Sequence, residues 1–401
     1  MGVPAEPVAG ADCKKHAREY GAKYYKHMIG HIFEWNSDLV NGRGRCAVRG
    51  GECSICGIAV ATASGGLPCQ PCTRQRQKTG NTQKTQSQEM HPGHDEVFEG
   101  FLDFLSEVGP AQWWAEEVMD FEPQLHEFAK CCTRAGYAVR AITVDQVDFV
   151  LVPRPRLIIA GFSHAAGHKA AADYFVKEMQ EAIAFVRGQK AAAAVGVGGV
   201  VDTADPDEIS RRAALQEQAR VEDLARAPRH FSKWQVHSSK IRSDNGVPRS
   251  ATPWSARSNV VMSGVPRTPR ILDLVETTWA VAVAQSPTTI QTKQLKKGLW
   301  VGLNQDIKRQ PITAAKRARG MPPVMTTGTM YYSFEADATI SGKGNLQLAG
   351  HPSDRASRSF FSESKLRDLA GETFCAAYCS IVSFVMYCNP HGEWWRSGSG
   401  P

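Results

Sequence analysis

Apolar and polar positions divide the first 162 residues into short, alternating segments. Apolar side chains recur at helical spacing over 96–108, and residues 123–135 form a second helical pattern that ends at Gly136. Short apolar runs typical of buried strands occur at 113–118, 137–144 and 156–162. Helices that alternate with such strands predict an α/β fold around a mostly parallel, covered sheet.

The pattern changes after Phe162. Alanine-rich residues 164–189, the charged segment 205–227 and residues 271–285 predict helices. Residues 228–270 are rich in Ser, Pro and Arg and predict a loop or partial disorder. We therefore expect four regions: a core over 1–163, a variable insert over 164–321, a return to the core over 322–388 and a loose tail over 389–401.

The composition is that of a globular protein. Of the 401 residues, 42% are hydrophobic and 22% are charged, which excludes a wholly disordered or collagen-like chain. The most apolar runs fall short of the roughly 20 residues that a membrane helix needs, and the first residues lack a charged-then-apolar signal segment. We expect a chain that enters no membrane and is not secreted, so its eleven cysteines are expected as free thiols, metal ligands or a nucleophile.

The formal net charge of +7 is unevenly spread. Between 226 and 320, 17 Lys and Arg residues stand against four acidic ones, whereas the rest of the chain holds 30 basic and 36 acidic residues. A basic middle on a mildly acidic scaffold indicates a segment that binds a polyanion, although a solvated basic linker has the same composition.

Four cysteines have the spacing of a metal site. Cys53-x2-Cys56 is followed after twelve residues by Cys69-x2-Cys72. Two Cys-x2-Cys knuckles can supply the four thiolates of a tetrahedral zinc ribbon. This spacing predicts a zinc-ribbon protein that binds nucleic acid.

The residues around Cys69 allow a second interpretation. The stretch Pro68-Cys69-Gln70-Pro71-Cys72-Thr73 resembles the Pro-Cys-Gln motif of the DNA (cytosine-5)-methyltransferases. In that family the motif lies just after a strand of the sheet, and its Cys attacks C6 of a cytosine.

Further stretches resemble motifs of the same family, in the family's order. Trp114-Ala115-Glu116-Glu117-Val118 resembles the Glu-Asn-Val motif, with Glu117 in place of Asn. Val152-Pro153-Arg154-Pro155-Arg156 resembles the Gln-x-Arg-x-Arg motif, with Val152 in place of Gln. After the insert, residues 345–352 resemble the Leu-Gln-Gly-Phe-Pro stretch, and residues 366–373 resemble the Ala-Gly-Asn motif. Because these matches keep the family's order, they specify the family better than any single one does.

The resemblance implies a fold and a chemistry. The fold is a Rossmann-like sheet of the S-adenosylmethionine-dependent methyltransferases, with the basic insert as target-recognition region. The Cys69 thiolate would add to C6 of a flipped cytosine, which activates C5 for methylation. Glu116 would act as a carboxylic acid on N3 and the exocyclic amine. Arg154 and Arg156 complete the implied catalytic residues, since a guanidinium can hold a phosphate or a base oxygen.

The resemblance also implies binding residues. S-adenosylmethionine would contact Glu6, Asp38, Pro68 and Gly371. DNA, with transfer RNA as the less favoured substrate, would contact Gln70, Thr73, Arg74, Arg76, Lys296, Lys297 and Arg309. The family's opening strand and Phe-x-Gly-x-Gly loop have no counterpart here, so a catalytically dead homologue that acts as a DNA-binding scaffold is a further alternative. A nuclear location is expected from the DNA substrate and from Lys316-Arg317-Ala318-Arg319.

Overall fold

The computed structural model describes most of the chain, in segments. These are residues 8–12, 14–66, 92–150, 152–164, 168–190, 206–247, 264–286, 292–310, 322–351 and 361–391. The chain forms two compact units. Unit 1 comprises Met1–Asp145, Pro155–Gly188 and Tyr378–Pro401, and unit 2 comprises Gln146–Arg154 and Gln189–Ala377.

A four-stranded sheet forms the centre of unit 1. Its strands, in spatial order, are β5 (Thr62–Gly66), β6 (Gln112–Val118), β8 (Pro155–Ser163) and β7 (Tyr137–Asp145). β5 and β6 are parallel, while β8 is antiparallel to both β6 and β7. Three strands thus run in one direction and β8 runs against them. The α/β class and the three predicted strands after residue 100 are confirmed.

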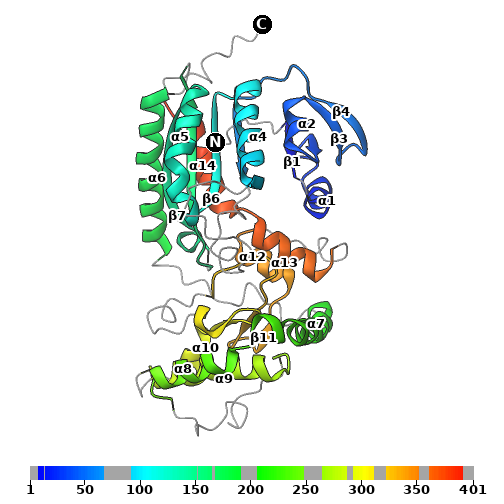
Figure 1. The fold of residues 1–401 in the computed structure, drawn as a ribbon, viewed down its shortest axis with the longest axis vertical. Helices are drawn as coiled ribbons and strands as arrows, with labels where there is room; N and C mark the ends of the chain where they lie inside the picture. Colours follow the sequence, from blue (N-terminus) through cyan, green and yellow to red (C-terminus); the bar gives the residue numbers. More distant parts are fainter. Residues whose placement is uncertain are drawn as a thin grey trace. The chain divides into compact units, whose positions relative to one another are not determined.

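Helices cover both faces of this sheet (Figure 1). Helices α4 (Pro92–Val108) and α5 (Leu125–Arg134) pack on one face, with the short helix η1 (Met119–Gln124) before α5. The core of this face contains Phe101, Leu105, Trp113, Ala115, Phe128, Leu157 and Ile159. Side chains of successive strand residues point to opposite faces, so Trp114 and Glu116 belong to the other face. There, α6 (His168–Lys190) and α14 (Ala376–Tyr387) pack, with Phe162 against Phe175 at 6.0 Å between ring centroids.

The N-terminal part of unit 1 is built from small elements with few buried apolar side chains. A parallel pair, β1 (Ala9–Ala11) and β2 (His31–Phe33), is connected by helix α1 (Lys15–Tyr24). Helix α2 (Asn36–Val40) leads into an antiparallel hairpin of β3 (Arg43–Cys46) and β4 (Gly51–Ser54). Among the described residues up to 60, the buried hydrophobic side chains are Ile32, Phe33 and Cys46.

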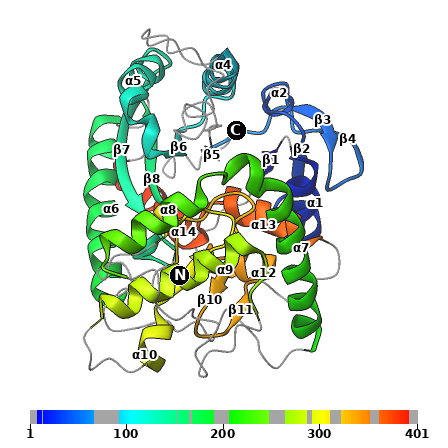
Figure 2. The ribbon, with the colours of Figure 1, turned by 60° about the horizontal axis from the view of Figure 1, so that its bottom comes forward.

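Unit 2 combines helices with a small antiparallel sheet (Figure 2). Its helices include α7 (Pro206–His230), α8 (Trp234–Asp244), α9 (Pro269–Ala284), α10 (Thr292–Lys297), η6 (Ile307–Arg309), α12 (Gly342–Leu348) and α13 (Glu363–Glu372). The sheet has the order β11 (Ala338–Thr339), β10 (Tyr331–Ser333), β9 (Trp300–Gly302). Residues of α9, β9 and β10 form its main hydrophobic core.

Helix α8 corrects the prediction of loop or partial disorder over 228–270 for Trp234–Asp244, while residues 248–263 lie outside the described residues. Polar contacts help to hold it, beside the packing of Ile241 on the core of unit 2: Arg242 Nε donates to Thr277 Oγ1 at 2.8 Å, and His237 Nδ1 lies 2.6 Å from Asp306 Oδ2. The partner residues lie on α9 and beside η6, far along the chain. A prediction from composition depends on the number of apolar residues in a segment. It therefore misses a helix that is stabilised by polar contacts with distant parts of the chain.

One stretch, Glu363–Tyr387, is long and apolar enough to cross a membrane by length and composition alone. It consists of two helices, α13 and α14, which are interrupted at residues 373–375. Helix α14 has 12 residues, fewer than the roughly 20 that a membrane span needs, and its Tyr378, Val382 and Met386 are fully buried in the protein. These features suit a helix of the protein interior, and the expectation that the chain enters no membrane stays a prediction.

Candidate active site

Glu116, the predicted catalytic acid, lies near the end of β6 and is 6% exposed. Its Oε1 atom lies 2.7 Å from Arg156 Nε, so the two motif residues form an ion pair. The pair follows from the strand register: Arg156 of β8 is opposite Val118, two residues from Glu116 on the same face of β6. The structure therefore brings together two residues that sequence analysis had linked only through separate motifs.

Tyr378 is a third member of this cluster. Its hydroxyl donates to Glu116 Oε1 at 2.9 Å, from the α14 face of the sheet. A buried tyrosine hydroxyl usually finds a polar partner. Tyr378 lies in a nearly continuous apolar segment of the sequence. In such a segment the helical spacing does not predict which polar group a tyrosine hydroxyl will contact. Sequence analysis missed it for this reason.

The end of β5 lies beside Glu116. In the parallel β5–β6 pair, Gly66 is the register partner of Glu116. The Pro-Cys-Gln motif begins two residues after Gly66 and lies outside the described residues. The described part of β5 therefore ends beside Glu116 of the Glu116–Arg156 pair.

Glu117 points to the opposite face of β6 and has a different environment. It is 1% exposed, and its Oε2 atom accepts a hydrogen bond from the Val118 backbone N–H at 3.0 Å. Its Oε1 atom is buried and has no hydrogen-bond partner in the part of the chain that the structure describes. Burial raises the pKa of Glu117 to about 8. Glu117 is therefore largely protonated at neutral pH.

Arg154, the other predicted catalytic arginine, belongs to unit 2 and is 3% exposed. Its Nη1 atom donates to the backbone carbonyl of Thr373 at 2.9 Å and to that of Ala370 at 3.4 Å. A cation that bonds the last carbonyls of a helix stabilises the helix end. Arg154 thus supports the C-terminus of α13.

The two late motifs also meet in unit 2. His351 Nε2 lies 2.6 Å from the Phe374 carbonyl and 2.7 Å from Thr373 Oγ1. Burial lowers the pKa of His351, which favours the neutral ring. His351 belongs to the stretch 345–352 and Thr373 to the stretch 366–373, so these contacts connect the two stretches with Arg154.

Two predicted cofactor residues have structural contacts. Asp38 Oδ2 accepts a hydrogen bond from the Trp35 N–H at 3.2 Å and caps α2. The Asp38 carboxylate also packs closely on Gly44, where an added Cβ would lie 2.6 Å from Cγ. Gly371 of α13 packs on the backbone of Thr327, and an added Cβ would lie 2.5 Å from the Thr327 nitrogen.

The predicted DNA-contacting residues of the insert lie at the surface of unit 2. Lys297 and Arg309 are exposed and Lys296 is half-buried. By contrast, Arg270, from the same basic segment, is 4% exposed, pairs with Asp223 and stacks on the Phe231 ring at 4.3 Å. The basic segment therefore supplies both surface charge and internal ion pairs.

Several predicted site residues lie outside the described part of the chain. They are Glu6, Pro68, Cys69, Gln70, Cys72, Thr73, Arg74 and Arg76.

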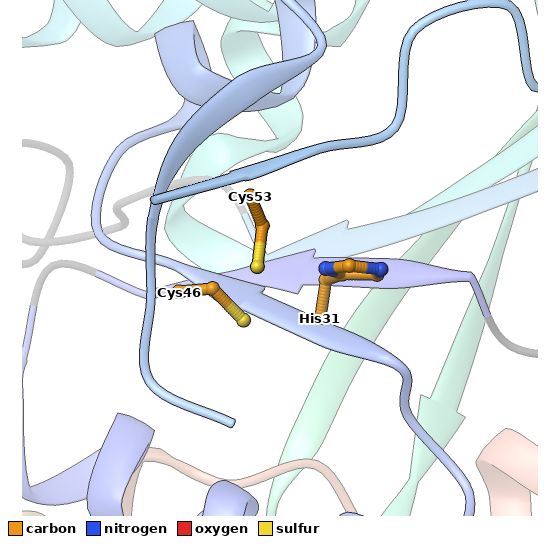
Figure 3. Close-up of side chains that lie close together, drawn as sticks. All are labelled: His31, Cys46 and Cys53. Carbon is orange, nitrogen blue, oxygen red and sulfur yellow. The ribbon is translucent and has the colours of Figure 1, made fainter. Parts of the chain in front are cut away.

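The zinc-ribbon set is described only in its first half. Cys56 is exposed, and its Sγ atom lies 3.4 Å from the Gly42 carbonyl oxygen. Cys53 instead lies with Cys46 and His31 (Figure 3). Among the described residues, Cys53 therefore has partners that the Cys-x2-Cys spacing did not predict.

Comparison with known proteins gives distant likenesses. No family model and no curated protein matches the chain. Among solved structures, a variant of Spodoptera frugiperda DNMT2 aligns at a TM-score of 0.45 and 10% identity over 96% of this chain and 93% of that one. The Dnmt2 methyltransferase of S. pombe aligns at 0.40 and 12% identity over 96% and 90%. The methyltransferase EhMeth of Entamoeba histolytica aligns at 0.40 and 9% identity over 98% and 90%.

Proposed function

We propose that this chain is a DNA (cytosine-5)-methyltransferase-like protein that acts on a flipped cytosine through Cys69. The main support is the 2.7 Å ion pair between Glu116 and Arg156, beside the strand end that leads into the Pro-Cys-Gln motif. A chance collection of short motif matches has no reason to converge in space, whereas a catalytic site requires it.

The proposed step is covalent catalysis. The Cys69 thiolate adds to C6 of the cytosine, and the electron pair of the C5–C6 double bond moves to C5. A bound S-adenosylmethionine would supply the methyl group that C5 takes and would leave as the thioether S-adenosylhomocysteine. Loss of the C5 proton to a base restores the double bond and expels the thiolate.

The chain geometry allows Cys69 to take part. Cys69 follows Gly66 by three residues, and three residues of extended chain span at most about 11 Å. Gly66 pairs with Glu116, so the proposed step needs Cys69, which is at most about 11 Å along the chain from Gly66, to face the same cytosine ring as Glu116.

Glu116 is held in place by two neighbours. Arg156 Nε lies 2.7 Å from its Oε1 atom, and the Tyr378 hydroxyl donates to the same oxygen. The Glu116 carboxyl group would accept a hydrogen bond from the exocyclic amine of the cytosine, and a proton shared with N3 would draw electrons from the ring as the thiolate adds. Arg156 acts here as the residue that fixes the carboxyl group.

S-adenosylmethionine would supply the methyl group, but the described residues do not form a fitting site for it. The carboxylate of Asp38 caps α2 and packs on Gly44, and the position of Gly371 is filled by the Thr327 backbone. Neither residue is free to hold the ribose or the adenine, and the remaining candidates, Glu6 and Pro68, lie outside the described residues. A second candidate function follows: a catalytically dead homologue that binds DNA as a scaffold.

Nucleic acid would approach the exposed basic side chains of the insert. Lys297 and Arg309 would contact phosphates, with sequence recognition secondary. We propose DNA as the substrate, with transfer RNA as the less favoured one, and a nuclear location follows from that substrate.

Covalent trapping tests the proposed function. A fluorine at C5 cannot leave as a proton does, so the Cys69 adduct on DNA that contains 5-fluorocytosine persists after methyl transfer. With S-adenosylmethionine, the wild type should give an adduct that is stable in denaturing gels, and Cys69→Ser should give none. DNA binding without an adduct from folded wild type would favour the scaffold function, and an adduct retained by Cys69→Ser would contradict the proposal.

A further inference from the structure

Three potential metal ligands from three strands meet in the N-terminal part of unit 1. One ligand atom each of His31 (β2), Cys46 (end of β3) and Cys53 (β4) lies within 4.8 Å of the others (Figure 3). The proposed methyltransferase chemistry uses none of these residues. We propose that His31, Cys46 and Cys53 bind a zinc ion that fastens the β3–β4 hairpin to β2.

The hairpin register places both thiols on one face. Gly44 pairs with Cys53 and Cys46 pairs with Gly51, so Cys46 and Cys53 are diagonal neighbours on the same side of the hairpin. Diagonal neighbours have Cα atoms about 7–8 Å apart, which is longer than most disulfides permit. Two zinc-bound sulfurs in a tetrahedral site lie about 3.8 Å apart, because each Zn–S bond is about 2.3 Å. Because the ligand atoms all lie within 4.8 Å of one another, the two sulfurs need to approach by at most about 1 Å to bind zinc.

Backbone hydrogen bonds hold Cys46 next to β2. The Ala47 N–H donates to the Ile32 carbonyl at 2.8 Å, and the Gly50 N–H donates to the Cys46 carbonyl at 2.9 Å. Gly50 has a φ of 73°, a backbone conformation that glycine adopts without strain. The turn after Cys46 is thus closed on the strand that carries His31.

The histidine has an unsatisfied ring nitrogen. His31 Nδ1 is buried and has no hydrogen-bond partner among the described residues. A buried polar atom without a partner costs stability, and coordination through Nδ1 would give it one. The His31 ring also stacks on Phe33, with 6.0 Å between centroids and 11° between planes, which restricts its orientation.

The donor set favours zinc. Two thiolates and one imidazole are ligands that zinc prefers, and a tetrahedral site leaves its fourth position for water or another donor. A structural role fits the surroundings, because Ile32, Phe33 and Cys46 are the buried hydrophobic residues described up to residue 60. Small units with so little core commonly depend on a metal.

Metal analysis and X-ray absorption of the full chain, purified without chelators, test the site directly. We expect one zinc per chain, with two sulfurs at about 2.3 Å and at least one nitrogen at about 2.0 Å. A chain that neither retains zinc nor takes up one equivalent would overturn the proposal. A shell of four sulfurs would overturn it in favour of the zinc ribbon.

Substitutions separate the two ligand sets. Cys46→Ser and Cys53→Ser should each lose the zinc. The control Cys56→Ser replaces an exposed cysteine just after β4 and should retain the zinc. In the cobalt-substituted protein, His31→Gln should shift the visible absorption bands while both thiolates remain. Far-UV circular dichroism checks the fold of each variant. Loss of zinc in Cys56→Ser, with retention in Cys46→Ser, would contradict the site.

Discussion

At the scale of residues, the two adjacent glutamates of β6 show how strand alternation assigns different roles to identical side chains. Glu116 meets Arg156 and Tyr378 on the α14 face, so its charge has a counter-ion. Glu117 is buried on the face of α4 and α5, and that burial raises the pKa of Glu117 to about 8. Two adjacent glutamates thus form one ion-paired carboxylate and one carboxyl group that stays protonated at neutral pH.

Glu117 should make stability depend on pH. Below its unfolded pKa of about 4.5, Glu117 is protonated in both states and costs nothing. As the pH rises toward about 8, the unfolded chain releases the proton while the folded chain keeps it, so stability is lost. At about 1.4 kcal/mol per pKa unit, the loss is roughly 3 kcal/mol at pH 7. Glu117→Gln should therefore raise the melting temperature at pH 7–8 and have little effect at pH 4.5.

Calorimetry at several pH values measures this effect. The exposed Glu122 offers a matched control on the neighbouring helix η1, and Glu122→Gln should leave the pH profile close to that of the wild type. If Glu117→Gln lowered the melting temperature equally at all pH values, Glu117 would not be the protonated group.

The sequence predicted Glu116 and Arg156 because each stands in a recognisable motif. It did not predict Tyr378 or the cluster of His31 with Cys46, because these contacts depend on where distant elements pack. The contacts of Arg154 could not be predicted from sequence either. Arg154 belongs to the same motif as Arg156, yet it donates to backbone carbonyls at the end of α13.

At the scale of elements, strand positions were easier to predict than strand direction. The apolar runs at 113–118, 137–144 and 156–162 correspond closely to strands β6, β7 and β8. The direction of β8 depends on residues 146–154, which connect it to β7 through the short helix η2 (Gln146–Asp148) in place of a crossover helix. Helix α8 was missed because polar contacts stabilise it.

Gly371 gives a test of packing in α13. An added Cβ would lie 2.5 Å from backbone atoms of Thr327, which cannot move away as a flexible side chain would. Gly371→Ala should therefore destabilise the protein by about 1–3 kcal/mol in chemical denaturation. Gly188→Ala, in the exposed end of α6 with no atom near the added Cβ, should instead be neutral or stabilising by about 0.5–1 kcal/mol. Equal effects of the two substitutions would refute the packing role of Gly371.

At the scale of the whole molecule, the charge of the basic segment has two uses that composition does not distinguish. Arg270 and Arg242 form ion pairs with Asp223 and Asp273 inside unit 2, whereas Lys297 and Arg309 remain at the surface. The exposed part of the charge is what a nucleic acid would meet. The paired part contributes to the fold of the insert.

The central claim is that Cys69 and Glu116 act together on a cytosine, and exchange of its C5 hydrogen tests it without a methyl donor. Addition of the thiolate to C6 lets C5 take a proton from water, and reversal releases the original hydrogen. With DNA tritiated at cytosine C5, the wild type should release tritium to water. Cys69→Ser should abolish the release, and Glu116→Gln should lower it by about 100-fold or more.

The matched control is Cys56→Ser, an exposed cysteine outside the proposed site, which should release tritium like the wild type. This assay is independent of the methyl-donor site, so it isolates the half of the site that the Glu116–Arg156 geometry supports. Release that depends on Cys69 and Glu116 is the predicted result. No release by folded wild type on DNA or transfer RNA, or equal release by Cys69→Ser, would contradict it.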